Sequence, residues 1–150
     1  MKEHNYYLIH NFIPLNRQLI RGELSFINFI KYSINLFKVY IYEILYEYIV
    51  FGISTSDIID LNLLTVNSEN VNEGRHYRPT HYYILKKIFH ELKSWLKIEE
   101  AFIIDYGSGL GRIIIFGLNQ GVVHAVGIEF AKELCDLCEQ NIKNSINKYN

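Results

Sequence analysis

Residues 102–112, FIIDYGSGLGR, contain the strongest structural signal in this chain. A short apolar run over 101–104 ends in the carboxylate of Asp105, and three glycines follow at every second position. An apolar run of this length fits a strand that is buried on both faces of a parallel sheet. Glycines directly after such a strand allow positive φ angles and let a ligand approach the backbone without meeting a Cβ atom. The stretch therefore predicts a strand, a tight ligand-binding turn and the start of a helix, although a turn without a ligand remains an alternative.

The flanking sequence alternates in the same manner, and it predicts an α/β fold with the order helix, strand, helix, strand, helix. Thr80 follows a proline and is a candidate N-cap for the first helix, which carries apolar residues at helical spacing from Leu85 to Leu96. The later elements are expected at 101–104 (strand), 110–118 (helix, with Gly121 as the residue after its end), 122–128 (strand) and 131–146 (helix). This order is typical of the start of a doubly wound parallel sheet.

Glu129 stands eighteen residues after the last glycine of the turn, where the second strand ends. A carboxylate at this place can accept hydrogen bonds from both hydroxyls of a ribose, and open α/β sheets bind ligands at the carboxyl ends of their strands. Together with the turn, Glu129 predicts an adenosine-type ligand that lies across the first two strands. A helix N-cap is the alternative role for this side chain.

The spacing of the turn separates two classes of such ligands. Nicotinamide and flavin folds prefer G-x-G-x-x-G with a pyrophosphate at the helix N-terminus. Here the pattern is D-x-G-x-G-x-G, Arg112 replaces the last dinucleotide glycine, and Asp105 would repel a diphosphate. An acid suits a ligand with a positive amino group, so the pattern favours methyl transfer over hydride transfer by an NAD-dependent oxidoreductase. Arg112 itself is expected to pair with a nearby carboxylate or to cover the sheet edge.

Four segments carry a resemblance to a known family. The segments DYGSGLGR (105–112) and GIEFAKELCDLCEQNI (127–142) resemble the first two motifs of class I S-adenosylmethionine-dependent methyltransferases. The segment YRPTHY (77–82) is similar to the Y-x-P-T lead-in of a bacterial branch, and FGISTS (51–56) looks like an upstream element of that branch. A more distant likeness is to the non-SET histone lysine methyltransferases. The resemblance covers roughly residues 51–146.

The resemblance implies a Rossmann-like fold, S-adenosylmethionine as cofactor and a methyl acceptor of unknown class. By the family pattern, Asp105 would orient the methionine amino end of the cofactor, and Glu129 would bind its ribose. The glycines would line the cofactor or, at Gly111, allow close helix packing, while Tyr77 and Thr80 would close over it. The implied cofactor-binding set is Tyr77, Thr80, Asp105, Gly107, Ser108, Gly109, Gly111 and Glu129. No catalytic base and no metal site is implied.

The N-terminal part, residues 1–51, reads as a helical segment that precedes a connector (52–78) and the partial cofactor domain (79–150). A polar stripe of Asn28, Lys31, Asn35 and Lys38 has helical spacing and leaves a broad apolar face, which predicts one long helix or a helix pair that covers the core. A tyrosine-rich helix in a membrane interface is the alternative. The acidic pair Glu43 and Glu47 disfavours that alternative, because anionic lipids would repel it. The connector is expected to supply a short strand or two, followed by a polar loop over 65–79.

Composition and length restrict the remaining possibilities. Fifteen Lys and Arg against sixteen Asp and Glu leave a net charge of −1, so no broad signal favours nucleic acid or membranes, and two cysteines do not make a disulfide framework. A cytoplasmic protein is expected.

The seven-stranded sheet that the resemblance implies needs on the order of 100 more residues than these 150. We therefore expect a fold truncated after its second strand, whose unpaired sheet edge could drive self-association. A non-catalytic remnant or interaction module is the alternative function.

Overall fold

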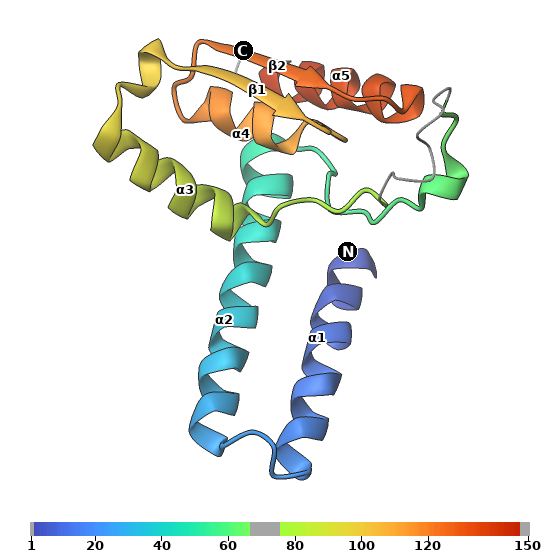
Figure 1. The fold of residues 1–150 in the computed structure, drawn as a ribbon, viewed down its shortest axis with the longest axis vertical. Coiled ribbons are helices and arrows are strands. Elements are labelled where there is room, and N and C mark those ends of the chain that lie inside the picture. The colour runs from blue at the N-terminus through green and yellow to red at the C-terminus, as the bar shows by residue number, and fades with distance from the viewer. Residues whose placement is uncertain (1, 67–75, 148–150) are drawn as a thin grey trace.

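The computed structural model describes residues 2–66 and 76–147, in which a helical hairpin stands beside a layer of helices and strands (Figure 1). The elements are α1 (Lys2–Ile20), α2 (Phe26–Ile44), a π-helical turn (Leu45–Phe51), α3 (Tyr82–Trp95), β1 (Phe102–Tyr106), α4 (Arg112–Asn119), β2 (His124–Ile128) and α5 (Lys132–Asn147), with 3-10 turns at Leu61–Leu63 and Ile98–Glu100. The chain thus mixes helices with a parallel sheet, and the alternation predicted after residue 79 is confirmed.

The hairpin forms because two helical segments are separated by a turn and a cap. Gly22 has a φ of 71° in the turn, a backbone conformation that favours glycine. The Oγ atom of Ser25 then accepts a hydrogen bond from the N–H of Asn28 at 3.3 Å and caps α2. Phe12 of α1 packs on Phe29 of α2 with ring centroids 5.8 Å apart. The N-terminal segment is therefore a helix pair, as predicted.

Only the C-terminal end of the hairpin packs on the core, so the expectation that the helix pair covers the core is confirmed in part. The hairpin meets the rest of the molecule at the C-terminal end of α2 and the π-helical turn, where Glu43, Glu47 and Phe51 are buried. The remainder projects away from the α/β layer (Figure 1) and leaves large side chains such as Phe26 and Phe37 exposed. Helical spacing predicts that a face is apolar, but it does not determine what packs against that face.

The sheet consists of β1 and β2, which run parallel with Phe102 opposite His124 and Tyr106 opposite Ile128. Helix α4 connects them and packs closely on one face through small residues. A Cβ atom at Gly117 would lie 2.7 Å from Cδ1 of Ile103, and one at Gly127 would lie 2.6 Å from Cδ1 of Ile114. The glycines therefore set the distance between helix and sheet.

The other face of the sheet is exposed, which corrects the prediction that β1 is buried on both faces. Phe102, Ile104 and Tyr106 are 57%, 48% and 76% exposed, and Val126 and Ile128 of β2 are 44% and 46% exposed. The register places Ile104 beside Val126 and Tyr106 beside Ile128, so these side chains form one apolar surface. No element within 2–66 and 76–147 buries them.

Helix α3 begins at Tyr82 with His81 at the N-cap position, so the prediction that Thr80 caps it was wrong. A side chain distant in sequence satisfies the first turn, because Oε1 of Glu43 accepts a hydrogen bond from the N–H of Tyr82 at 2.9 Å. A carboxylate is also favourable there because the N-terminus of a helix carries a partial positive charge. The cap of α3 is thus supplied by α2.

An aromatic cluster forms the core between the π-helical turn, α3 and α4. Ring centroids of neighbouring residues lie 5.2–6.0 Å apart within the set Tyr46, Phe51, Tyr82, Phe89 and Phe116. Leu85 is buried with them, whereas Ile88, Leu92, Trp95 and Leu96 of the predicted apolar face of α3 are exposed. The cluster positions the start of α4, and with it the glycine-rich turn.

The connector and the C-terminal helix complete the fold. Where a short strand or two was expected, the structure has an isolated antiparallel bridge between Ile59 and Tyr77 and one 3-10 turn; residues 67–75 of the expected polar loop lie outside the described residues. Helix α5 agrees with its prediction within one residue, and its cysteines are free thiols. Burial raises the pKa of Cys138 to about 11.

Among the described residues, none of the helices has the length and apolar character needed to cross a membrane.

Candidate functional site

The turn after β1 is held on the end of β2 by backbone hydrogen bonds. The N–H groups of Gly107 and Ser108 both donate to the carbonyl oxygen of Ile128, at 2.7 and 3.2 Å. The N–H of Gly111 donates to the carbonyl of Ser108 at 2.8 Å and closes the turn. The φ angles at Gly107, Gly109 and Gly111 are 79°, 51° and 81°, so all three positions need glycine, as the sequence predicted.

The space around each glycine differs. A Cβ atom at Gly107 would meet nothing within 4 Å, so this position borders open space. At Gly109 it would collide with the ring of Tyr77, and at Gly111 it would lie 2.5 Å from Sγ of Cys138 in α5. Gly111 therefore allows close helix packing, as expected. Of the glycines in the turn, Gly107 thus borders open space, while Tyr77 covers Gly109.

Glu129 organises the turn from the end of β2. Its Oε2 atom accepts a hydrogen bond from the N–H of Gly109 at 2.9 Å, and its Oε1 atom accepts from the N–H groups of Phe130 and Ala131 at 2.9 and 3.1 Å. A carboxylate has about four acceptor positions, so about one stays available to a ligand hydroxyl. The hydrogen bond from the N–H of Ala131, the residue just before α5, also agrees in part with the alternative role of Glu129 as a helix N-cap.

Asp105 lies in β1, partly buried, opposite Gly127. Burial and then the negative charge of Glu129 raise the pKa of Asp105 above its ordinary value of 3.8. None of the hydrogen bonds among residues 2–66 and 76–147 involves its carboxylate. A cationic group that bound there would relieve the repulsion from Glu129 and stabilise the charged form.

A cavity of about 260 Å³ lies between the turn and the connector, and it brings together Tyr77, Gly107 and Glu129 of the predicted set. Ser108, Gly109, Gly111, Thr80 and Asp105 are not part of its lining. The side chain of Ser108 is turned to the sheet, where its Oγ atom would lie 2.6 Å from a Cβ atom at Gly127. The structure therefore divides the predicted set into residues that line the cavity, residues that shape the turn, and two residues outside both groups, Asp105 and Thr80.

Five further residues line the cavity, and none of them was predicted. Leu64, Phe130 and Leu134 supply apolar side chains, while His76 and Arg78 contribute cationic or polar groups. Phe130 is adjacent to Glu129, and His76 and Arg78 flank Tyr77, so neighbourhood to a predicted residue is the signal that could have identified them.

The two lead-in residues have different surroundings. The hydroxyl of Tyr77 donates to the carbonyl oxygen of Thr55 at 2.9 Å, and burial raises the pKa of this phenol. Thr80 is exposed, and its carbonyl oxygen accepts a hydrogen bond from Nη1 of Arg112 at 3.1 Å. Tyr77 therefore lies over the turn, whereas the backbone of Thr80 contacts the buried Arg112. That the two residues close over a cofactor stays a prediction.

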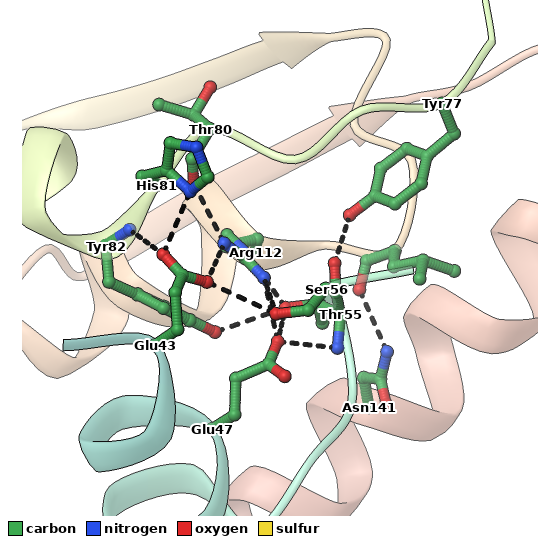
Figure 2. A network of polar contacts seen from close by, with 11 residues as sticks. Glu43, Glu47, Thr55, Ser56, Tyr77, Thr80, His81, Tyr82, Arg112 and Asn141 are labelled. Carbon is green, nitrogen blue, oxygen red and sulfur yellow. Dashed lines mark hydrogen bonds and ion pairs between the residues drawn. The ribbon is translucent and has the colours of Figure 1, made fainter. Parts of the chain in front are cut away.

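Arg112, the first residue of α4, is the centre of a buried polar network (Figure 2). Its Nη1 atom donates to Oε2 of Glu43 at 2.7 Å, its Nη2 atom to Oε1 of Glu47 at 2.8 Å, and its Nε atom to Oγ1 of Thr55 at 2.8 Å. The guanidinium carbon lies 4.3 Å from the centre of the Tyr82 ring, a cation–π contact. The prediction that Arg112 pairs with a carboxylate is confirmed, and the structure shows two partners.

The charge of the network is set by its hydrogen bonds. Burial alone would raise the pKa of Glu43, but the hydrogen bond to His81, the charge of Arg112 and the N–H of Tyr82 outweigh burial and lower the pKa below 4.5. Glu43 therefore stays ionised at neutral pH. The sequence signal for this network is the presence of two acids, Glu43 and Glu47, one helical turn apart within an apolar helix.

The network joins the hairpin to the glycine-rich turn. Arg112 follows Gly111 directly, and Thr55, which bonds Arg112 with its side chain, accepts from Tyr77 with its carbonyl oxygen. Asn141 of α5 donates to the carbonyl of Leu110 at 3.1 Å from the other side (Figure 2). The conformation of the turn thus depends on contacts from α2, the connector and α5.

Comparison of this chain with protein-family models, with curated proteins and with solved structures finds no match. In the described part of the chain, no group of three or more His, Cys, Asp and Glu residues is arranged to hold a metal ion. The features of the site that could serve chemistry are two carboxylates, the open side of Gly107 and a small, partly apolar cavity.

Proposed function

We propose that this chain binds S-adenosylmethionine at the cavity beside Gly107, as the cofactor-binding part of a class I, Rossmann-like methyltransferase. The observation that carries the proposal is the position of Gly107. Its backbone borders open space and a cavity shared with Glu129, at the end of the strand that holds Asp105. This arrangement agrees with the family resemblance of residues 105–112 and 127–142.

The residues present fit the two ends of this cofactor. The carboxylate of Asp105 suits the methionine ammonium, because a cation would relieve its burial and its repulsion from Glu129. The free acceptor position of Glu129 suits a ribose hydroxyl, and Leu64, Phe130 and Leu134 suit an apolar ring face. The volume of about 260 Å³ is near the lower end of small-molecule sites, about 300–1,000 Å³, so the cavity would hold the nucleoside part.

Electrostatics disfavours a dinucleotide at the same place. Asp105 and Glu129 put two carboxylates beside the turn, and both would repel a diphosphate. Arg112 stands at the start of α4, where a diphosphate would be expected, but its guanidinium is buried and neutralised by Glu43 and Glu47. Beside Asp105, the two carboxylates therefore favour a positively charged group of the ligand.

When bound, the cofactor would supply a methyl group activated by its sulfonium. The contribution of the protein is to fix the ligand: Asp105 would bind its amino group, Glu129 would orient its sugar, and Tyr77 would keep the turn closed from the connector side. Holding two reactants in line can contribute a large part of the rate of such a transfer.

Calorimetry with S-adenosylhomocysteine, and separately with NAD, tests the proposal. We expect saturable binding of S-adenosylhomocysteine, weakened about tenfold or more by Asp105→Asn or Glu129→Gln, since hydrogen bonds to charged groups contribute about 1.5–3 kcal/mol. Asp136→Asn removes an exposed carboxylate on α5 and serves as the control. Binding of NAD without binding of S-adenosylhomocysteine would contradict the proposal.

The exposed face of the sheet favours a second candidate function, an interaction module that associates through its sheet. Ile104 and Val126 lie side by side at its centre, and β1 and β2 each have one edge without a partner strand in the described residues. Sedimentation equilibrium distinguishes this candidate. It requires self-association that Ile104→Lys with Val126→Lys abolishes, whereas cofactor binding does not depend on association.

A further inference from the structure

One face of α2 is apolar, exposed and continuous. Its residues, called here the α2 stripe, are Phe26, Ile27, Ile30, Ile34, Phe37 and Ile41. At 100° per residue they fall within about 100° of the helix circumference, and each is between 42% and 66% exposed. Helix α1 packs on a different side of α2, through residues such as Phe29. The stripe is thus an apolar surface that projects from the molecule with the hairpin (Figure 1).

Positive charges border the α2 stripe. Lys31 and Lys38 are seven residues apart and exposed, and on the helical wheel they lie along one edge of the stripe. Residues 26–42 contain no Asp or Glu. The first 42 residues hold five Lys and Arg against two Glu, a net charge of +3, in a chain whose total is −1. The hairpin therefore combines an apolar stripe with the positive end of the molecule.

The acids that disfavoured a membrane interface are not on this surface. Glu43 and Glu47 are buried, and both form ion pairs with Arg112 at 2.7 and 2.8 Å. They face the α/β layer and are neutralised there, so they would not meet lipid headgroups. With this objection removed, the exposed part of the hairpin has the features of a helix that lies in a lipid interface: large apolar side chains flanked by lysines whose ammonium groups reach headgroups.

We propose that the α2 stripe docks on the surface of a bilayer that contains anionic lipids, with Lys31 and Lys38 at the headgroups. Charge decides between this occupant and a second copy of the chain. Two hairpins of net charge +3 repel each other, whereas an anionic bilayer attracts the lysines, the exposed Arg17 of α1 and the exposed Arg21 of the turn after it. The helix would lie in the interface and not cross it, in agreement with the lack of a spanning helix among the described residues.

Flotation of the intact protein with lipid vesicles tests this inference. We expect partitioning onto vesicles of phosphatidylcholine with phosphatidylglycerol, much weaker partitioning onto phosphatidylcholine alone, and loss of binding at high salt. The variant Lys31→Gln with Lys38→Gln should weaken partitioning on the order of 30-fold, the factor that two lysines near an anionic surface supply. The control, Lys97→Gln with Lys143→Gln, removes the same charge from the α/β layer and should bind as the unchanged protein does.

The apolar part of the inference has its own matched variants. Ile30→Ser with Phe37→Ser should weaken partitioning by about tenfold or more, because both side chains would leave the interface. Ile88→Ser with Trp95→Ser changes two exposed residues of α3 at the same spacing and should have no effect. All four variants alter exposed side chains, and circular dichroism checks that they fold. Equal binding to neutral and anionic vesicles, no binding to either, or dimerisation through the hairpin in place of binding would each overturn the inference.

Discussion

The guanidinium of Arg112 and the carboxylate of Glu47 are 65 residues apart in sequence and meet at 2.8 Å, with side chains that are 3% and 0% exposed. Glu47 belongs to the π-helical turn at the base of the hairpin, and Arg112 is the first residue after the glycine-rich turn. This contact therefore joins the N-terminal segment to the candidate cofactor site. A buried charge without its partner is costly, so the pair makes the two parts depend on each other.

Replacing Arg112 by methionine should lower the free energy of unfolding by about 3–5 kcal/mol, because two carboxylates would stay buried without their cation. Urea denaturation measures the change. The control Lys132→Met breaks an exposed pair with Asp136 and should cost less than about 1 kcal/mol. Adding Glu43→Gln and Glu47→Gln to Arg112→Met should restore part of the loss; a triple variant less stable than the single variant would contradict this explanation.

Stability should fall as the solution is acidified through the titration of Glu43. The folded protein holds the pKa of Glu43 below 4.5, so this carboxylate contributes stability above that pH and loses it as the pH falls through the lowered pKa. Denaturation midpoints measured between neutral and acidic pH give the slope. In Glu43→Gln this contribution to the slope should disappear, whereas Glu139→Gln, an exposed acid in α5, should leave it unchanged.

Gly111→Ala should destabilise the protein for two separable reasons. A left-handed backbone costs a non-glycine residue about 1–2 kcal/mol, and the new methyl group would lie 2.5 Å from Sγ of Cys138. In a Cys138→Ala background the clash with Sγ is removed, and Gly111→Ala should lower the free energy of unfolding only by the strain of the left-handed backbone. Gly107→Ala is the matched control, because its φ is 79° and its Cβ atom would meet nothing. Equal costs for Gly111→Ala in both backgrounds would show that the close packing is absent.

Asp105→Asn should raise stability while it weakens cofactor binding. The carboxylate is held partly buried against the charge of Glu129, so a neutral amide relieves repulsion; we expect a gain of up to about 1 kcal/mol, in the range of other stabilising substitutions at functional sites. Thermal denaturation and calorimetry with S-adenosylhomocysteine measure the two effects on one sample. A purely structural carboxylate would give the opposite sign, a loss of stability with unchanged binding.

The sequence predicted those parts of the structure that local spacing determines. The strand, the positive φ angles of the turn and the helices on either side all follow from residues 80–146, because glycine positions and apolar periods act over a few residues. Glu129 was placed at the end of the second strand for the same reason. The prediction of short strands in the connector was wrong, because isolated apolar residues such as Ile59 do not determine whether a partner strand exists.

Properties that depend on distant contacts could not be predicted. The sequence indicated that Arg112 needs a carboxylate, but the choice of Glu43 and Glu47 depends on how the hairpin meets α4. The same contact gives α3 its cap from Glu43 in place of Thr80. The spacing of polar and apolar residues in α2 correctly predicts an apolar face, yet this face is exposed in the structure. Periodicity indicates which side chains share a face and not what covers them.

The central claim is that the cavity beside Gly107 and Glu129 binds S-adenosylmethionine, and nuclear magnetic resonance tests it most directly. A titration of the ¹⁵N-labelled chain with S-adenosylhomocysteine should shift the amide signals of Gly107, Glu129 and Phe130 in a saturable manner and leave those of Ile30 and Phe37 in the hairpin unchanged. Absence of shifts at the turn with millimolar ligand, or shifts confined to other parts of the chain, would contradict the claim.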